Sequence, residues 1–121
     1  MEIAPKISVV LPTYNRGYII SRAIESILNQ TFQDFELIIV DDGSTDNTEA
    51  VVRTFADPRI RYVKELHRGG AAARNTGIFI SRGEFIAFQD SDDEWLPEKL
   101  EKQMAAFAEA DSSVGIVYTG F

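Results

Sequence analysis

The sequence contains no cysteine among its 121 residues, which excludes disulfide bonds and metal sites built from thiolates. Basic residues are also scarce, because 12 Lys and Arg stand against 19 Asp and Glu and give a formal net charge of -7. That sign argues against a nucleic-acid backbone or an anionic membrane as the main partner. No apolar run approaches the roughly 20 residues that span a bilayer, and the N-terminus lacks the pattern of a signal peptide.

What the sequence does contain is the composition of an ordinary globular domain. Hydrophobic residues make up 45% and charged residues 26% of the chain, and this length suits one domain with a modest core. There is no internal repeat, linker or low-complexity stretch, so residues 1–121 are expected to form a single domain. The last residues are apolar and end in Phe121, where a natural terminus is usually polar. We therefore expect this chain to be part of a longer protein.

Five segments are predicted to form strands. Ile7 to Leu11 and Phe35 to Val40 are short, uninterrupted apolar runs, which is typical of strands buried on both faces, and Pro12 is expected to end the first. The segment 59–65 alternates charged and apolar residues, which is typical of the edge of a parallel sheet. The fourth and fifth predicted strands are residues 84–89 and 114–121.

Helical patterns separate these strands. The first has apolar residues at i, i+3, i+4, i+7 and i+8, which form one stripe: Ile20, Ala23, Ile24, Ile27 and Leu28. A second helix is expected after Asp46, which would cap it together with Glu49 in a capping box. Its apolar face would come from Ala50, Val51 and Phe55.

Two more helices are predicted in the second half of the chain. One runs from Ala71 to about Ser81, opens after Gly69-Gly70 and is closed by Gly83. The other has Pro97 in its first turn, and its inward residues are Leu100, Met104 and Phe107. Because strands and helices alternate, with connections too long for hairpins, the sequence predicts a parallel, doubly wound α/β sheet with right-handed crossovers.

In such a sheet, ligands bind beyond the carboxyl ends of the strands, near the topological switch point. Polar and small residues follow four of the predicted strands, and we expect all four sets to converge on one edge. They are Pro12, Thr13, Tyr14, Asn15 and Arg16; Asp41, Asp42 and Gly43; His67, Arg68, Gly69 and Gly70; and Asp90, Ser91, Asp92 and Asp93.

The acidic cluster Asp90, Asp92 and Asp93 is the strongest chemical signal, because unpaired carboxylates this close resist ionising together. Carboxylate oxygens are the ligands that Mg²⁺ and Mn²⁺ prefer, and such an ion takes its remaining ligands from water and substrate phosphates. A divalent cation carrying a diphosphate would thus supply the missing positive charge. The alternative is a solvated acidic turn, or a cap of the next helix by Asp92 or Asp93.

The other candidates each have a functional and a structural interpretation. A carboxylate of Asp41-Asp42-Gly43 could accept hydrogen bonds from a base or ribose, or the segment could be a simple turn. Tyr14 could stack on a base or be a half-buried aromatic at a strand end. Backbone N–H groups at Gly69-Gly70 could meet a phosphate, with Arg68 and Arg74 offsetting its charge, or these could be loop and surface residues. His67, the only histidine, is expected to be exposed rather than catalytic.

Four stretches of the chain together resemble the nucleotide-binding half of the family 2 inverting glycosyltransferases, which have the GT-A fold. They are ISVVLPTYNR at 7–16, SILNQTFQDFELIIVDDGSTDNT at 26–48, GGAAARNTGI at 69–78 and GEFIAFQDSDDEWLPEKL at 83–100. They occur in the order of the family and cover nearly the whole chain. The resemblance implies a Rossmann-like, three-layer α/β/α domain.

The resemblance also implies roles for individual residues. Thr13 and Tyr14 would contact the uracil and ribose, and Asp42 would bind the base with Asp41 beside it. Asp90-Ser91-Asp92 would contact the ribose and hold the metal, with Asp93 as a further candidate. The full nucleotide-binding set is Pro12, Thr13, Tyr14, Asn15, Arg16, Asp41, Asp42, Gly43, Gly70, Arg74, Asp90 and Ser91, and the metal ligands would come from Asp90, Asp92 and Asp93.

The implied activity is metal-dependent, inverting transfer from a nucleotide-diphosphate sugar, with a UDP-sugar expected, to a hydroxyl of a carbohydrate or lipid-linked acceptor. A role in polysaccharide biosynthesis would fit. The family's general base is a carboxylate in a later segment, so we expect it beyond residue 121 and expect this chain alone to be inactive. We expect a cytoplasmic location, including the inner face of the membrane by way of other segments or partners.

Three other functions compete with this one. A sugar-phosphate nucleotidyltransferase would need a Gly-rich basic loop after the first strand, where this chain has LPTYNR. A dinucleotide oxidoreductase would need Gly-x-Gly-x-x-Gly there, which is absent. A non-catalytic, receiver-like module could hold a nucleotide or metal in its acidic pocket, but it would want a lysine after the fifth strand, where Tyr118-Thr119-Gly120 stands.

Overall fold

The computed structural model describes residues 4–109 and 116–117. Its centre is a five-stranded sheet in the order β3-β2-β1-β4-β5, and every pair of neighbouring strands is parallel. The predicted doubly wound α/β sheet is therefore confirmed. Its strands are β1 (Ile7–Thr13), β2 (Phe35–Asp41), β3 (Ile60–Lys64), β4 (Phe85–Phe88) and β5 (Ile116–Val117).

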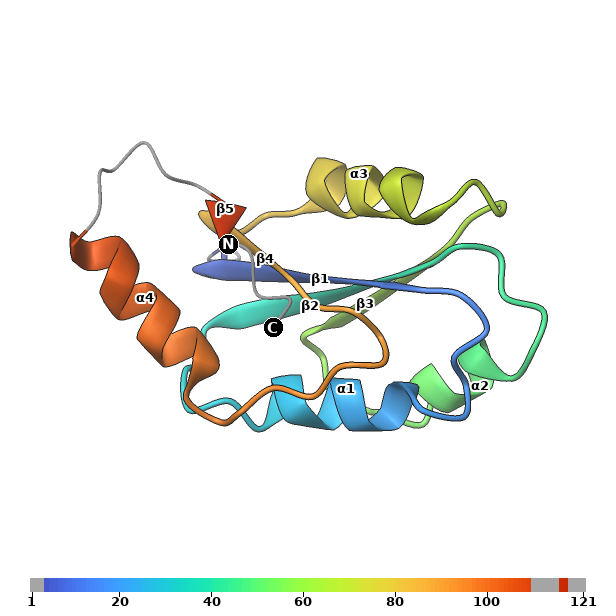
Figure 1. The fold of residues 1–121 in the computed structure, drawn as a ribbon, viewed down its shortest axis with the longest axis horizontal. Helices are drawn as coiled ribbons and strands as arrows, with labels where there is room; N and C mark the ends of the chain where they lie inside the picture. The colour runs from blue at the N-terminus through green and yellow to red at the C-terminus, as the bar shows by residue number, and fades with distance from the viewer. Residues whose placement is uncertain (1–3, 110–115, 118–121) are drawn as a thin grey trace.

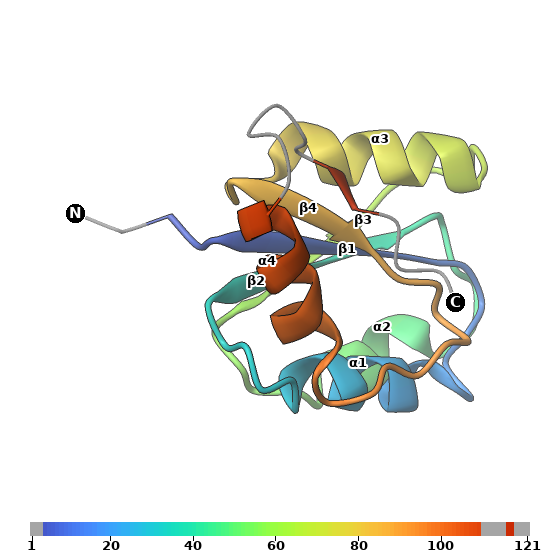
Figure 2. The same cartoon turned by 60° about the vertical axis from the view of Figure 1, so that its left-hand side comes forward.

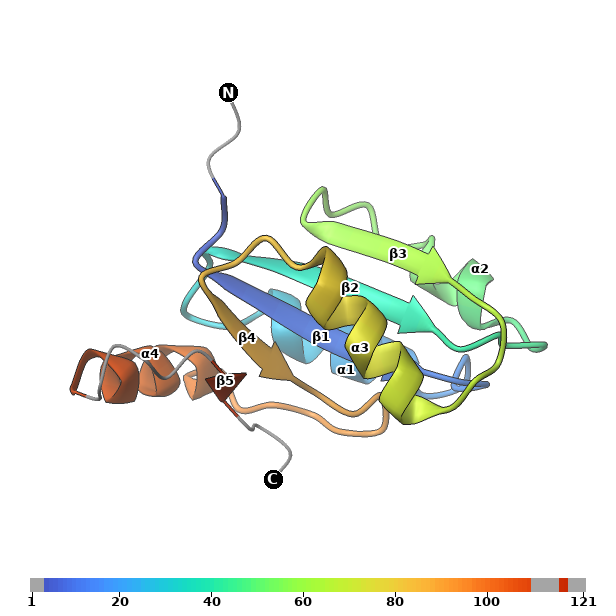
Figure 3. The same ribbon diagram turned by 90° about the horizontal axis from the view of Figure 1, so that it is seen from above.

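The strand order places the topological switch point between β1 and β4. The chain runs from β1 outward to β2 and β3, and then crosses back to place β4 on the other side of β1 (Figure 3). The chain continues from β1 to β2 on one side of this point and from β4 to β5 on the other, and ligands of open α/β sheets bind beyond the carboxyl ends of the strands at such a point. β3 lies at one edge of the sheet, as its alternating sequence predicted.

Helices cover both faces of the sheet. In Figure 1, α3 lies above the sheet while α1 and α2 lie below it, and Figure 2 shows the same layers after rotation. No helix within the described ranges is long and apolar enough to cross a membrane. The helices are α1 (Ile20–Leu28), α2 (Thr48–Val52), α3 (Gly70–Ile80) and α4 (Lys99–Glu109).

Alternation along β1 and β2 builds a core on each face of the sheet. Leu11 and Leu37 pack with the buried stripe of α1, which confirms that stripe. Ile38 points to the opposite face and packs with Ala73 of α3. The helix approaches closely because Gly77 has no side chain; a Cβ there would meet a methyl group of Val10.

Pro12 does not end the first strand, as had been expected, because β1 continues through it to Thr13. Val10 accepts a hydrogen bond from the Gln89 N–H on the β4 side of the strand, and alternate residues of a strand face the same neighbour. The missing N–H of Pro12 thus falls on the β4 side, beyond the point where β4 has ended. No ladder bond is lost there, while pairing with β2 continues.

The predicted capping box of α2 is not formed. The N-cap residue is Asn47, and Asp46 accepts a hydrogen bond from the Thr48 N–H two residues on. Glu49 is drawn away from the helix start, because it pairs with Arg53 one turn later. The apolar face also differs, since Val52 is the buried residue. Of the residues predicted for it, Ala50 is exposed and Val51 and Phe55 are partly buried against the core.

Two further boundaries differ from the prediction. α3 ends at Ile80, with Ser81 extended, so Gly83 does not close the helix. Gly83 instead allows close packing against β1, because a Cβ there would lie 2.5 Å from the Ser8 backbone nitrogen. Pro97 lies before α4 rather than in its first turn.

The inward residues of α4 are confirmed as far as the structure describes them. Leu100 is buried and Met104 packs against the core, but the side chain of Phe107 lies outside the described part. Of the fifth predicted strand, only residues 116–117 lie in the described part, and they pair with β4.

Candidate nucleotide-binding site

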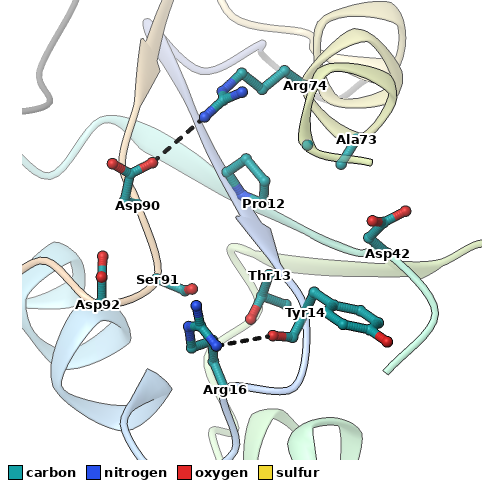
Figure 4. Close-up of a pocket in the computed structure, with 11 residues that line it drawn as sticks. Pro12, Thr13, Tyr14, Arg16, Asp42, Ala73, Arg74, Asp90, Ser91 and Asp92 are labelled. Atoms are coloured by element: carbon teal, nitrogen blue, oxygen red, sulfur yellow. Dashed lines mark hydrogen bonds and ion pairs between the residues drawn. The ribbon is translucent and has the colours of Figure 1, made fainter. Parts of the chain in front are cut away.

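A pocket of about 310 Å³ opens at the carboxyl ends of β1, β2 and β4, beside the N-terminal end of α3 (Figure 4). All of its lining residues except Ala73 were predicted from the sequence, and Ala73 carries no functional group that could have marked it. The lining residues are Pro12, Thr13, Tyr14, Arg16, Asp42, Gly70, Ala73, Arg74, Asp90, Ser91 and Asp92.

Asp42 lies at one end of this pocket with its carboxylate held by the loop after β3. The N–H groups of Arg68 and Gly69 donate to it at 2.7 and 3.0 Å, and the Nδ1 atom of His67 lies 2.9 Å from its Oδ2. Burial opposes the charge of Asp42, which is only 4% exposed. The two backbone hydrogen bonds and the charge of His67 outweigh burial and hold the pKa of Asp42 below its usual value. Asp42 therefore presents an ionised, acceptor-only carboxylate to the pocket.

Tyr14 lies beside Asp42 and remains accessible. Its ring stacks on the ring of His67, with centroids 4.2 Å apart and planes at 25°. The residue is 39% exposed, so a flat aromatic surface is available next to the carboxylate of Asp42 (Figure 4). His67 is exposed, as predicted, but its ring is engaged by both neighbours.

Three residues of the predicted nucleotide-binding set do not line the pocket and instead hold its loops. Asp41 is fully buried and accepts hydrogen bonds from the Tyr62 hydroxyl and the Ser44 N–H. Burial, together with the hydrogen bond to Asp41, raises the pKa of Tyr62. Gly43 adopts a φ of 79°, and a Cβ there would lie 2.8 Å from the backbone nitrogen of His67. These contacts join the loop after β2 to β3 and the loop after it.

Asn15 is the third of these residues. It has a left-handed φ of 50°, which asparagine tolerates better than most residues. Its side-chain oxygen accepts a hydrogen bond from the Thr45 N–H at 2.8 Å, and its own N–H donates to the Ser44 hydroxyl at 2.8 Å. Asn15 thus fastens the loop that carries Tyr14 and Arg16 to the loop after β2.

Charged side chains line the other end of the pocket. Asp90 and Asp92 are exposed and follow β4, while Arg74 of α3 lies across from them, 3.6 Å from an oxygen of Asp90 (Figure 4). The Arg16 side chain comes from the β1 loop and lies 3.5 Å from the Tyr14 carbonyl. The arrangement can thus offer both carboxylates to a cation and guanidinium groups to an anion.

Thr13 adds a polar group to the floor of the pocket. It is only 3% exposed, and its hydroxyl has no hydrogen-bond partner among the described residues. Buried hydroxyl groups are normally satisfied, so a ligand or water in the pocket would complete this one.

Asp93 does not line the pocket with Asp90 and Asp92. Its Oδ1 accepts a hydrogen bond from the Glu94 N–H at 3.2 Å, and its own N–H closes a turn onto the Asp90 carbonyl. Both Asp92 and Asp93 lie well before Lys99, where α4 begins, so neither caps that helix.

The two lining carboxylates fit a divalent cation that takes its other ligands elsewhere. Within the described part of the chain, no three His, Asp or Glu side chains are grouped to hold a metal by themselves. Mg²⁺ commonly uses one or two carboxylates and completes its shell with waters and substrate phosphates. Asp90 and Asp92 would suffice for such a site, with the guanidinium of Arg74 nearby.

A parallel sheet with a polar pocket at its switch point defines an α/β domain of the class that binds its ligands beyond the carboxyl ends of the strands. Residues 8–121 match the family described as Glycosyl transferase family 2, and the chain belongs to that family. This confirms the resemblance inferred from the sequence.

Two named relatives illustrate the family membership. The chain is 45% identical over 100 residues to UDP-Glc:alpha-D-GlcNAc-diphosphoundecaprenol beta-1,3-glucosyltransferase WfgD of Escherichia coli, covering 82% of this chain and 40% of WfgD. It is 42% identical over 113 residues to glycosyltransferase GlyG of Streptococcus pneumoniae, covering 91% of this chain and 38% of GlyG. The chain therefore spans less than half the length of these relatives.

Solved structures of the same kind share the fold. S. aureus TarS 1-349 in complex with UDP-GlcNAc superimposes with a TM-score of 0.80 at 35% identity, over 86% of this chain and 31% of that one. Mannosyltransferase PcManGT from Pyrobaculum calidifontis in complex with GDP-Man and Mn²⁺ gives a TM-score of 0.78 at 32% identity, over 93% of this chain and 34% of that one. The Rossmann-like GT-A fold expected from the sequence is thereby confirmed.

Proposed function

We propose that this chain is the donor-binding part of an inverting glycosyltransferase, and that it binds a UDP-sugar together with a divalent cation. The observation that supports the proposal is that two kinds of groups lie at opposite ends of one pocket. Tyr14 and Asp42 stand at one end as a surface for a base, and Asp90, Asp92 and Arg74 stand at the other as a charged site for a diphosphate. Nucleotide-sugar complexes of TarS and PcManGT support this reading of the pocket.

The base end favours particular nucleobases. An ionised Asp42 can accept hydrogen bonds but cannot donate them, so it suits a base edge that carries an N–H group. Uracil, thymine and guanine have a ring N–H on their Watson–Crick edge, whereas the ring nitrogen of cytosine accepts and only its exocyclic amino group can donate. Stacking on Tyr14 adds affinity of about 1–3 kcal/mol per base without selecting among bases. Asp42 would therefore favour bases that carry a ring N–H group.

The charged end would receive the diphosphate. Arg16 and Arg74 bring guanidinium groups, whose planar N–H donors match phosphate oxygens. Asp90 and Asp92 would hold Mg²⁺ or Mn²⁺. Such an ion, when bound, supplies Lewis-acid stabilisation of the departing nucleoside diphosphate. Thr13 and Ser91 line the same pocket and would offer hydroxyl groups to the ribose.

Transfer itself needs a general base that lies within about 2.6–3.2 Å of the acceptor hydroxyl and deprotonates it. We assign no residue of this chain to that role and place the general base outside residues 1–121. The acceptor would be a carbohydrate or lipid-linked hydroxyl, and the protein would act in the cytoplasm or at the inner face of the membrane. Family membership favours sugar transfer over a nucleotidyltransferase or a non-catalytic nucleotide-binding module.

Calorimetry with UDP, GDP and TDP, each with and without Mn²⁺, tests the base preference and the cation together. We expect UDP with Mn²⁺ to bind most tightly and EDTA to weaken it. CDP serves as the matched control, because the ring nitrogen of cytosine accepts where that of uracil donates, so that only the exocyclic amino group of cytosine could donate to Asp42. Equal affinities for UDP and CDP would contradict recognition of the uracil ring N–H by Asp42, and an absence of nucleotide binding under all conditions would contradict the proposed function.

A further inference from the structure

His67 is absent from the pocket lining, yet it contacts both residues assigned to the base. Its ring stacks on Tyr14, which follows β1, and its Nδ1 approaches Asp42, which follows β2. His67 itself belongs to the loop after β3. One side chain that follows a third strand thus contacts two pocket residues that follow two other strands.

The hydrogen-bond geometry settles where the proton of this histidine lies. Nδ1 is 2.9 Å from the Asp42 carboxylate and 3.1 Å from the Asp42 carbonyl oxygen. Both partners are acceptors, so Nδ1 must carry the hydrogen. The ring plane is consequently fixed by Asp42 on one side, and that plane sets the orientation of the stacked Tyr14 ring.

The backbone around His67 is equally constrained. The backbone N–H groups of Arg68 and Gly69 donate to Asp42. Gly43 packs so closely that a Cβ there would lie 2.8 Å from the backbone nitrogen of His67. The ring of His67 therefore stands on an anchored loop. Because the centroids of Tyr14 and His67 are 4.2 Å apart, no third ring fits between them.

We propose that His67 is a positioning residue of the nucleobase site, which holds the Tyr14 ring and the Asp42 carboxylate in the geometry that selects the base. This inference rests on the proposed function, because it concerns the same pocket. Without His67, the exposed Tyr14 ring would adopt other rotamers, and Asp42 would lose its only side-chain partner among the described residues. Base affinity and base discrimination would fall together, while the charged end of the pocket would be unaffected.

Two partial variants separate the two contacts of His67. His67→Phe keeps a flat ring for Tyr14 but loses the donor to Asp42, whereas His67→Gln keeps a side-chain donor but loses the ring. His67→Ala loses both. Leu66→Ala is the matched control, because Leu66 is the preceding residue of the same loop and is 83% exposed.

The probes are uridine, which tests the base end alone, and pyrophosphate with Mn²⁺, which tests the charged end alone. We expect His67→Ala to weaken uridine binding by at least about tenfold, which corresponds to about 1.4 kcal/mol. His67→Phe and His67→Gln should each lose part of this. Pyrophosphate binding should match the parent chain in every variant, as should both ligands with Leu66→Ala.

The outcomes distinguish the inference from the proposed function. A parent chain that binds UDP while His67→Ala binds uridine equally well would overturn the role of His67 alone. Equal losses for uridine and pyrophosphate would also overturn it, since they would show a general loss of structure. A parent chain that binds neither UDP nor uridine would overturn the proposed function and this inference with it.

Discussion

The guanidinium group of Arg74 lies 3.6 Å from a carboxylate oxygen of Asp90, so that α3 and the loop after β4 face each other across the pocket with opposite charges. Both side chains are about half exposed, and such pairs contribute little to folding stability, typically about 0–1 kcal/mol. Their placement is therefore better explained by the pocket than by stability. Arg74 can turn to a phosphate and Asp90 to a cation without destabilising the fold.

Asp92→Asn is expected to weaken the binding of UDP in the presence of Mn²⁺ by about 1–3 kcal/mol, the scale for losing a charged hydrogen-bonding partner. The reason is that Asp92 lines the pocket beside Asp90, and its charge would hold the cation. Calorimetry with and without EDTA measures the effect. Asp93→Asn is the matched control, because that carboxylate does not line the pocket and should matter less. UDP affinity that is insensitive to EDTA would refute metal-dependent binding.

Asp42→Ala should weaken uridine binding even when no metal is present, because Asp42 accepts from the base rather than from the cation. A loss of about tenfold or more in affinity would match one charged hydrogen bond, about 1.5–3 kcal/mol. Asp41→Asn provides the contrast, because Asp41 is buried against Tyr62 and Ser44. That variant should lower the free energy of unfolding and leave uridine binding nearly unchanged. If Asp41→Asn weakened uridine binding and Asp42→Ala lowered only the free energy of unfolding, Asp41 rather than Asp42 would be the residue that contacts the nucleobase.

Asn15→Gly is expected to loosen the loop that carries Tyr14 and Arg16. Glycine keeps the left-handed φ of 50° but removes the acceptor for the Thr45 N–H, at a cost of about 0.5–1.5 kcal/mol. Asn15→Ala should cost about 1 kcal/mol more, because alanine does not tolerate this backbone conformation well. Urea unfolding followed by the fluorescence of Trp95, the single tryptophan, measures both variants. Equal stabilities of the two would show that the backbone conformation carries no cost.

Glu36→Gln should destabilise the chain at neutral pH by about 1–3 kcal/mol. Glu36 is buried at the other end of the sheet and accepts hydrogen bonds from the Ser8 hydroxyl, the Arg82 N–H and Arg61. Burial raises the pKa of Glu36, but these hydrogen bonds outweigh burial and lower it below its ordinary value of 4.5.

The sign of the pH dependence follows from that lowered pKa. The contribution of Glu36 to the free energy of unfolding is complete above the ordinary pKa and is lost as the pH falls through the lower pKa of the folded state. The difference between the parent chain and Glu36→Gln should therefore shrink in acid, as measured by urea unfolding at several pH values. Glu84→Gln is the control, since its ion pair with Lys6 is exposed. A difference that grows in acid would contradict the lowered pKa of Glu36.

Local pattern was sufficient to predict most of the fold. The uninterrupted runs at Ile7 and Phe35 predicted buried central strands, and the apolar stripe of α1 predicted the helix that covers them. The residues after each strand could be predicted to share one edge, because parallel strands all end on the same side. Boundaries were less certain, since hydrogen bonds from elsewhere decided them. β1 runs through Pro12 only because β4 has already ended beside it.

The sequence by itself thus determined the order of strands and helices and the identity of nearly every residue around the pocket, because periodicity and strand ends are local properties. Only the tertiary structure decided what each residue does there. Asp41 and Asp42 are adjacent and chemically identical, and alternation along the chain sends the first into a buried contact with Tyr62 and the second into the pocket. Asp93 likewise does not line the pocket with Asp90 and Asp92, and the role proposed for His67 depends on two partners that follow other strands. Such contacts join residues that are distant in the chain, so no local pattern encodes them.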